Sequence, residues 1–261
     1  MPIRHKWNLG LELECAFFYR EDARCSGIRS FKSKMKNLNS DIEFDTDYSV
    51  ELKRSDLPTA RSFNFDFFPL EIKTPPLALE ESLELAERCF DLMSESSVQT
   101  NATCGLHANF SPVLKSVYNK VNLAKAQINP YWGIVAKAFG RDKNYYCKPM
   151  SPESALVETC SELARRPREI GNQLYRLIWY VNRMRFSTGS EHPSAFGLPL
   201  VRDSGSLHKR QAISLRNWHV VRKPTSRIEL RAMGNKDYHK NATKVREYIL
   251  GSVDALEQCL D

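Results

Sequence analysis

Apolar residues occupy every second position in the stretch Trp7-Asn8-Leu9-Gly10-Leu11-Glu12-Leu13-Glu14-Cys15. Alternate residues of a β-strand point to opposite faces of a sheet, so this period of two predicts a strand over residues 7–17. One face of the strand is apolar, whereas Glu12 and Glu14 share the other face. Two neighbouring carboxylates repel each other and need either bulk water or a cation. The stretch therefore predicts a sheet with one apolar and one charged face.

The same division into an apolar and a polar set recurs in other predicted strands. Residues 67–73, 103–111 and 226–232 alternate in this way, and residues 213–221 form a hairpin with the last of them through a turn at residues 223–225. The polar sets are Glu71 and Lys73; Gly105, His107, Asn109 and Ser111; and Arg227, Glu229 and Arg231. A solvated outer face usually carries Lys, Thr and Ser. The collected carboxylates and histidine instead predict a functional face.

Helical spacing of apolar residues appears between and after these strands. It predicts helices over residues 79–93, about 168–185 and 245–260. The spacing of strands and helices is irregular, and no glycine-rich phosphate loop follows a strand. This pattern favours an α+β fold with an antiparallel sheet over a doubly wound fold. We expect one domain over residues 1–261, with residues 189–205 as a long internal loop.

Composition narrows the class of protein. The 261 residues are 42% hydrophobic and carry a formal net charge of +7, which excludes wholesale disorder and a fibrous repeat. No stretch approaches the ~20 apolar residues that cross a membrane, and Glu12 and Glu14 interrupt any signal-type apolar segment. The seven cysteines show no metal-ligand spacing and suit a reducing compartment. These features predict a cytoplasmic protein without a membrane partner.

The basic residues cluster in two places, residues 24–36 and residues 165–185. The first cluster is dotted with Ser and Asn and is expected to be a loop, whereas the second decorates the helix predicted at 168–185. A solvated surface is favoured over nucleic-acid contact for both clusters. A phosphate-bearing substrate would also be attracted to such a surface.

The charged face has the groups that hard cations and phosphates require. Four glutamates could supply oxygen ligands to Mg²⁺: they are Glu12, Glu14, Glu71 and Glu229. His107 could be a metal ligand or donate to a phosphate. Arg231 presents a planar fork of donors that suits a phosphoryl group in transfer. The face therefore predicts metal-assisted phosphate chemistry.

Four ordered segments resemble the amidoligase family. They are Gly10-Leu11-Glu12-Leu13-Glu14; Asp47-Tyr48-Ser49 followed by Glu71-Ile72-Lys73-Thr74-Pro75-Pro76; Cys104-Gly105-Leu106-His107-Ala108-Asn109; and Arg227-Ile228-Glu229-Leu230-Arg231. Each motif is common by itself, and their order over residues 8–260 carries the resemblance. The family consists of carboxylate–amine ligases of the glutamine synthetase fold, similar to glutamine synthetase and glutamate–cysteine ligase.

The resemblance implies a fold, a reaction and cofactors. The fold is a curved antiparallel sheet with helices packed on its convex face and with MgATP and the carboxylate substrate on its concave face. ATP phosphorylates a carboxylate, an amine attacks the acyl phosphate, and an amide, ADP and phosphate result. The cofactors are ATP and Mg²⁺, and two or more ions are compatible with the number of carboxylates. The partners stay open among amino acids, a polyamine, a peptide or protein side chain and a modified nucleobase.

The resemblance also assigns roles to individual residues. The metal ligands are Glu12, Glu14, Glu71, His107 and Glu229, and the catalytic residues are Arg231, Glu71 and Glu229. Nucleotide contacts fall to His107, Asn109, Ser111 and Arg231. Asn109 stands where the family often has a second histidine, so this contact departs from the family pattern.

Several residues have two interpretations. Asp47 and Ser49 either line the site or form an Asx turn. Cys104 follows the parity of Leu106, which favours a buried structural thiol. Arg141 lies in a basic aromatic segment that either closes over a substrate or, as we favour, forms a surface loop.

Two other functions share some of these residues. A nucleic-acid-binding module with an inactive ligase-like core would use the basic clusters, but four glutamates on its face would repel phosphates. A metal-dependent phosphoesterase would use the carboxylates and would hydrolyse a nucleotide without an amine. Formation of an amide distinguishes the ligase from both.

Overall fold

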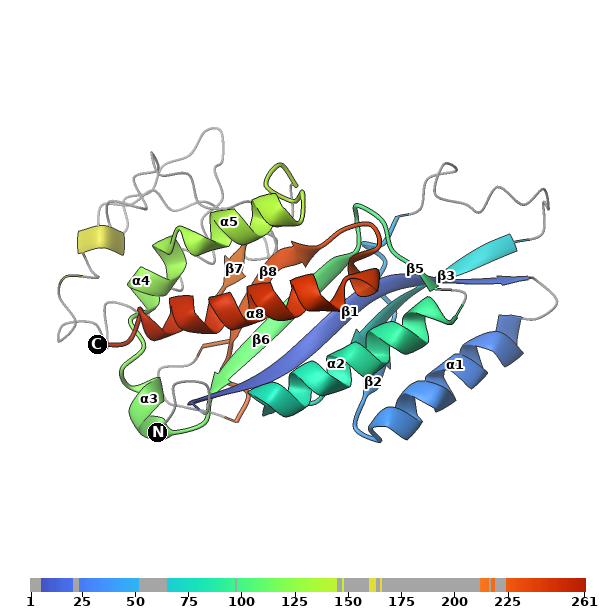
Figure 1. The fold of residues 1–261 in the computed structure, drawn as a ribbon, viewed down its shortest axis with the longest axis horizontal. Coiled ribbons are helices and arrows are strands. Elements are labelled where there is room, and N and C mark those ends of the chain that lie inside the picture. Colours follow the sequence, from blue (N-terminus) through green and yellow to red (C-terminus); the bar gives the residue numbers. More distant parts are fainter. Residues whose placement is uncertain are drawn as a thin grey trace, which may run out of the picture.

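The computed structural model describes residues 6–20, 24–51, 65–96, 98–144, 147, 160–162, 165, 212–215, 217–218 and 224–261. These residues form an open eight-stranded sheet in which every pairing is antiparallel, in agreement with the predicted α+β class. The main order is β2-β3-β1-β6-β8-β7, and β4 and β5 also pair with β1 (Figure 1). The strands are β1 (Trp7–Arg20), β2 (Glu43–Asp45), β3 (Phe65–Lys73), β4 (Leu77–Ala78), β5 (Val98–Gln99), β6 (Gly105–Pro112), β7 (Ile213–Ser214) and β8 (Ile228–Gly234).

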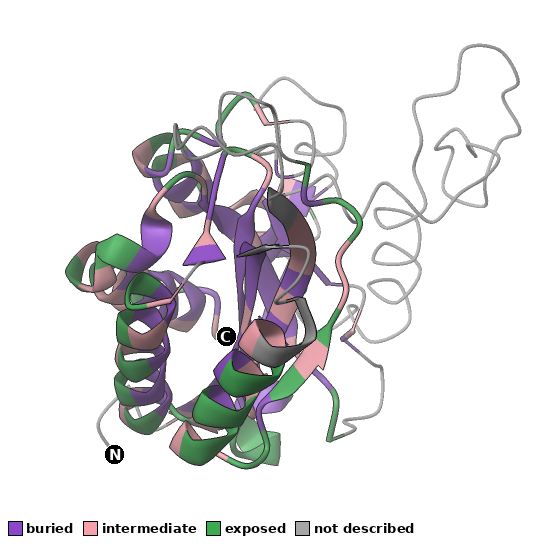
Figure 2. Cartoon of the chain, turned by 90° about the vertical axis from the view of Figure 1, so that its right-hand side faces the viewer, coloured by how far each residue is buried: buried purple, intermediate pink, exposed green. Residues whose placement is uncertain are grey.

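Three long helices lie across one face of this sheet (Figure 1). They are α1 (Arg24–Leu38), α2 (Leu79–Ser94) and α8 (Ala242–Glu257). Shorter helices follow β6 and β8: α3 (Lys115–Tyr118), α4 (Leu123–Ile128), α5 (Tyr131–Ala138) and the 3-10 helix η6 (Tyr238–Lys240). Figure 2 shows the helices with their buried sides toward the strands and their exposed sides outward. Within the described residues, no helix has the length and apolar character needed to cross a membrane.

The core lies between the sheet and the helices. The apolar residues of β1 are buried completely or almost completely. They include Leu9, Leu11, Leu13 and Cys15. The apolar stripes of α2 and α8 belong to the same cluster, with Leu83, Ala86, Phe90, Ile249, Val253 and Leu256 among their members. Each large apolar side chain that is buried in this way stabilises the fold by about 1.5–3 kcal/mol. The period of two in β1 and the helical period in α2 thus meet at one interface.

Strand register keeps the apolar sets on a common face. Leu13 lies opposite Leu106 in the pair of β1 and β6, and Leu9 lies opposite Phe110. Between β6 and β8, Leu106 pairs with Met233 but Ala108 pairs with Leu230. One residue of β6 therefore faces two residues of β8, which is a β-bulge. Leu230 and Met233 are three residues apart and would point to opposite faces of a regular strand. Because of the bulge, both side chains point into the core.

Residues 24–36 form helix α1, and the predicted loop there is wrong. Phe31 and Met35 are buried in the core, and Ile28 and Leu38 pack against it. These residues are spaced by 3, 4 and 3 positions, which is a helical period. The Ser, Asn and Lys residues between them were the reason for predicting a loop. The Lys32 ammonium lies 5.2 Å from the centre of the Phe44 ring of β2.

Other boundaries shift between sequence and structure. The strands predicted at 213–221 and 226–232 do pair, but β7 holds only residues 213–214 and β8 extends to residue 234. The C-terminal helix spans Ala242–Glu257, three residues earlier at each end than predicted. The helix predicted at 168–185 and the loop predicted at 189–205 lie outside the described residues.

Gly234 closes β8 in a conformation that other residues rarely adopt. Its φ is 121°, and an added Cβ would lie 2.5 Å from the Cys104 carbonyl oxygen and 2.8 Å from the Gly105 Cα. Both atoms belong to the backbone of the neighbouring chain segment and cannot turn aside. The close approach of β8 to the start of β6 therefore requires glycine here.

Gly234→Ala should lower the free energy of unfolding by about 1–3 kcal/mol, because of the strained φ and the backbone contact. Gly27→Ala is the matched control. Its Cβ would meet the Phe17 ring at an ordinary 3.4 Å, and alanine is favoured over glycine within a helix by about 1 kcal/mol. Urea unfolding measures both variants. Equal unfolding free energies for the two would contradict this account of β8.

Candidate active site

The polar face of the sheet, opposite the helices, bounds a cavity of about 450 Å³. Five acidic residues and four basic ones, counting the histidine, reach it together with small polar residues. The lining residues are Glu12, Glu14, Asp47, Ser49, Glu71, Thr103, His107, Arg141, Ser214, Asn217, Arg227, Glu229 and Arg231. They come from β1, β3, β6, β7 and β8 and from the segments that join these strands. The polar residues that alternate along the predicted strands therefore lie on one charged surface.

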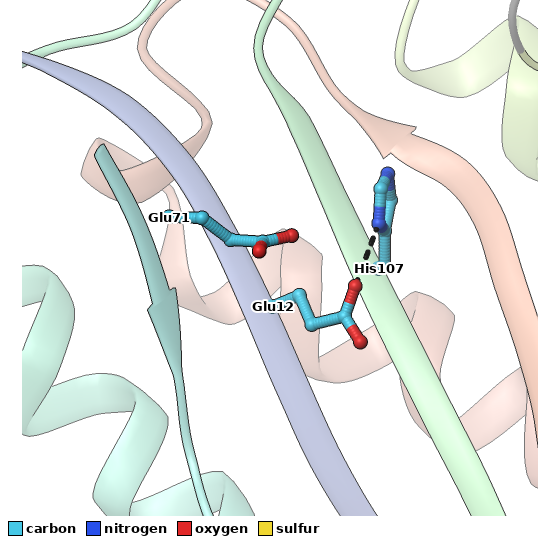
Figure 3. A group of neighbouring side chains, drawn as sticks. All are labelled: Glu12, Glu71 and His107. Carbon is cyan, nitrogen blue, oxygen red and sulfur yellow. Dashed lines mark hydrogen bonds and ion pairs between the residues drawn. The ribbon is translucent and has the colours of Figure 1, made fainter. Parts of the chain in front are cut away.

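Glu12, Glu71 and His107 converge from three adjacent strands (Figure 3). Each offers a ligand atom, and these atoms all lie within 4.8 Å of one another. The Nδ1 atom of His107 is 3.1 Å from a Glu12 carboxylate oxygen. Two carboxylates and one imidazole within this distance form a set that could hold a divalent cation.

A second group shares one of these residues. Glu14, Asp47 and Glu71 also bring carboxylate oxygens within 4.8 Å of one another. Glu14 comes from β1 and Glu71 from β3, whereas Asp47 lies in the turn that follows β2. Glu71 is common to both groups, so one carboxylate can bridge two neighbouring cation positions.

Gly105 fixes the buried carboxylate of Glu14. Its backbone N–H donates to Glu14 Oε2 over 2.5 Å, and His107 Nε2 lies 3.3 Å from Glu14 Oε1. A Cβ at residue 105 would stand 2.6 Å from His107 Nε2 and 2.9 Å from Glu14 Oε2. Glycine therefore allows the imidazole and the carboxylate to share this space.

Burial sets the ionisation of the carboxylates. Burial and the neighbouring charge of Asp47 raise the pKa of Glu14, although the charge of His107 opposes them. Burial also raises the pKa of Glu71 against the opposing influence of Lys73. At Glu12, burial favours the neutral acid, but hydrogen bonds from His107 and Asn109 outweigh it and lower the pKa to about 2. A bound cation would offset the cost of burying the ionised carboxylates of Glu14 and Glu71.

Arg231 and Glu229 form an ion pair on β8. Glu229 Oε1 also lies 3.5 Å from His107 Nδ1, so this pair borders the first carboxylate group. Burial alone would lower the pKa of Arg231, but the charges of Glu229 and Glu14 raise it and keep the guanidinium protonated. Its Nε is buried and has no hydrogen-bond partner among the described residues. The structure thus brings Arg231 and all five predicted metal-ligating residues to one surface.

Asn109 and Ser111 occupy different places from these residues. Asn109 donates to Glu12 Oε1 over 3.1 Å and accepts from Arg227 Nε over 2.9 Å. It is buried and is not among the described residues that line the cavity. Ser111 lies further along β6, opposite Asn8, and also stands outside the lining. Asn109 therefore orients Glu12 and Arg227 in this structure.

The cavity also contains residues that have no single predicted role. Asp47 and Ser49 fulfil both interpretations, since Ser49 N–H donates to Asp47 Oδ1 in an Asx turn and both line the cavity. Arg141 is 3% exposed, so the favoured surface loop is wrong for this residue. Arg227 had a signal in the parity it shares with Glu229. Thr103 had the same kind of signal, because it begins the strand predicted at 103–111 with the parity of His107. Arg141 had only the less favoured alternative that its segment closes over a substrate.

The Cys104 thiol is buried, as its parity predicts. Its Sγ lies 3.5 Å from Asn101 Oδ1, and burial raises the thiol pKa to about 12. A thiol of this kind is protonated at neutral pH and is a poor nucleophile. Cys104 is therefore a structural residue beside the site.

Glu12→Gln should reduce the acid sensitivity of the metal-free protein. Folding lowers the pKa of Glu12 from 4.5 to about 2, so its ionised form stabilises the fold above pH 4.5 and this contribution disappears as the pH falls towards 2. The stability difference between wild type and variant should shrink by at most about 3 kcal/mol across this window. Urea unfolding with a chelator measures it.

Glu14 and Glu71 have raised pKa values, and their contributions are lost as the pH rises. Both proteins in the comparison retain these two residues, so their influence cancels except for the part by which the charge of Glu12 raises the pKa of Glu71. A stability difference that stays constant across the acidic window would contradict the ionised state assigned to Glu12.

Comparison with known proteins agrees with this site. A family model described as "Putative amidoligase enzyme" matches residues 8–189. The match includes β1, β3 and β6 and ends before β8, so the placement of Glu229 and Arg231 rests on the geometry. No curated protein and no solved structure matches the chain. The family model covers more than half of the sequence, and the chain therefore belongs to the amidoligase family.

Proposed function

We propose that this protein is an ATP- and Mg²⁺-dependent carboxylate–amine ligase that works through an acyl phosphate and releases ADP and phosphate. The observation that carries the proposal is that two clusters of possible metal ligands lie in one cavity and share Glu71. One cluster is Glu12, Glu71 and His107, and the other is Glu14, Asp47 and Glu71. Membership of the amidoligase family supports an amide-bond-forming ligase with a carboxylate and an amine as substrates. On this proposal the open antiparallel sheet is a glutamine synthetase-like catalytic fold.

The donor set fits Mg²⁺. Oxygen ligands from carboxylates, water and phosphate are those that Mg²⁺ prefers. Glu12, Glu71 and His107 would hold one ion, and Glu14, Asp47 and Glu71 a second. In these positions Mg²⁺ would supply positive charge that stabilises a transferring phosphoryl group.

Arg231 and His107 complete the phosphate site in this proposal. The Arg231 guanidinium is held at the cavity by Glu229, and its remaining donors suit a phosphoryl group whose charge is spread over three oxygens. His107 is fixed between Glu12 and Glu14 and would orient both carboxylates. Asn109 holds Glu12 in place. Each residue is preorganised by a neighbour, so little rearrangement is required on binding.

Mutations in the two ligand clusters should reduce metal binding to different extents. Glu71→Gln should abolish tight binding of Mn²⁺, a spectroscopic substitute for Mg²⁺, at both positions because the residue is shared. Asp47→Asn should weaken one position and leave the group of Glu12, Glu71 and His107 intact. Electron paramagnetic resonance titration of Mn²⁺ counts the ions, and two are expected for the wild type.

Glu84→Gln is the control, because Glu84 is exposed on α2 and distant from the cavity. It should bind as many ions as the wild type. Thermal unfolding with MgATP follows the same variants, since a ligand of the folded state raises its stability. Equal Mn²⁺ binding by wild type and Glu71→Gln would remove the shared carboxylate from the proposal.

Arg231→Lys should lower kcat by at least about tenfold, because an ammonium does not replace the planar fork at a phosphoryl group. The assay combines MgATP with panels of carboxylates and amines and detects the amide, ADP and phosphate. Unchanged kcat in the variant would place the phosphoryl group elsewhere. ATP hydrolysis by the wild type without any amide would favour the phosphoesterase.

A further inference from the structure

Arg141 lies at the end of the cavity that adjoins the start of β6. Its Nη1 donates to the Cys104 carbonyl oxygen over 2.5 Å, and its Nε donates to Cys147 Sγ over 3.1 Å. These two bonds use two of the five N–H donors that a guanidinium carries. The residue is 3% exposed and is one of the residues that line the cavity.

The charge of Arg141 has no acidic partner among the described residues. Its two hydrogen-bond acceptors are a neutral carbonyl and a thiol. Arg231, by contrast, is paired with Glu229. A buried guanidinium cannot lose its proton at neutral pH, and leaving such a charge without a counterion costs free energy. An anion in the cavity would supply the missing partner.

The chain holds Arg141 in place through backbone geometry. The N–H of Gly140 donates to Lys137 and that of Arg141 to Ala136, which is a Schellman motif at the end of α5. Gly140 has a φ of 64°, which glycine adopts without strain. At Gly234, a Cβ would lie 2.8 Å from Arg141 Nη1, so the glycine leaves room for the guanidinium.

The bonds of Arg141 are dispensable for the backbone. The Cys104 carbonyl also accepts from the Asn235 N–H over 2.8 Å, so it keeps a partner if the guanidinium is removed. The bond to Cys147 involves sulfur, a weak acceptor. A purely structural arginine would instead satisfy a group that has no other partner. The positioned guanidinium therefore fits recognition of a ligand better than support of the fold.

The position of Arg141 separates it from the other cationic side chains. It contacts Cys104, the residue before β6, whereas Arg227 contacts Asn109, five residues further along the chain. Five residues of extended chain span about 16 Å. Glu14, which accepts from the Gly105 N–H, and Glu12, which accepts from Asn109, lie along this span. A substrate that crosses the cation positions would thus meet a guanidinium at either end.

We propose that Arg141 is the substrate-specificity residue of the cavity and binds an oxyanion of a substrate, a carboxylate or a phosphate, in its planar fork. The inference rests on the proposed function because it takes the cavity as the substrate site. Arg141 acts by binding and orienting this anion and takes no part in proton transfer. On this view, substrates of the ligase carry an anionic group that reaches the Gly105 end of β6.

The test compares Arg141→Met and Arg141→Lys with wild type. Calorimetric titrations in the presence of Mg²⁺ use three probes: inorganic phosphate, succinate and ATP. The methionine variant should lose at least about tenfold in affinity for the probe whose oxyanion contacts Arg141 and retain its affinity for the others. The lysine variant should be intermediate, because it keeps the charge but not the fork. Arg246→Met is the control and should bind as the wild type does, because Arg246 pairs with Glu80 and Glu87 between α8 and α2 and does not line the cavity.

The probe that is affected identifies the source of the oxyanion. Loss of ATP binding assigns a nucleotide phosphate, and loss of succinate binding alone assigns the carboxylate substrate. Arg141→Met should leave the urea midpoint of the ligand-free protein unchanged or raise it, because it removes an unpaired buried charge. A lowered midpoint with unaltered affinity for every probe would make Arg141 a structural residue and overturn the inference.

The two proposals fail separately. Absence of Mg²⁺-dependent ATP binding by the wild type contradicts the proposed function, while the phosphate and succinate titrations still decide the role of Arg141. Absence of binding for all three probes to the wild type would count against the anion site itself.

Discussion

The pairing of β1 with β6 is the constraint on which the remaining structure depends. Burial of Leu9, Leu11 and Leu13 against the helices fixes the register in which Leu13 faces Leu106. A slip by one residue would turn His107 into the core and Leu106 onto the charged face. The hydrophobic effect therefore places the imidazole beside Glu12 and the Gly105 N–H beside Glu14. The site is a consequence of the register that the core enforces.

The charged face stores unfavourable interactions that the core outweighs. Glu14 and Asp47 lie close enough to influence each other's pKa, and burial raises the pKa of Glu71. Each of these side chains is held by a specific neighbour, so the repulsion is kept within a rigid sheet. Natural proteins accept such strain chiefly at functional sites, where a ligand relieves it. The arrangement is one that cations and anions would stabilise from opposite ends of the cavity.

Much of this arrangement followed from local sequence patterns. The period of two predicted β1, β3, β6 and β8 and the face on which each side chain lies. It also selected the residues of these strands that line the cavity, which include Glu12, His107 and Arg231. The helical period located α2 and α8 within a few residues. The prediction missed α1, because its short apolar stripe, which contains Phe31 and Met35, lies among many Ser, Lys and Asn residues that are typical of a loop.

The sequence by itself determined which side chains share a strand face, since alternation is a local property of the backbone. Tertiary structure alone decided which strands are neighbours and which loops reach the cavity. Asp47 joins Glu14 and Glu71 because β2 pairs with β3. Arg141 arrives through the end of α5, and the register of β6 with β8 places Arg231 across from His107. These contacts join residues far apart in the chain, and no periodicity encodes a distance between separate segments.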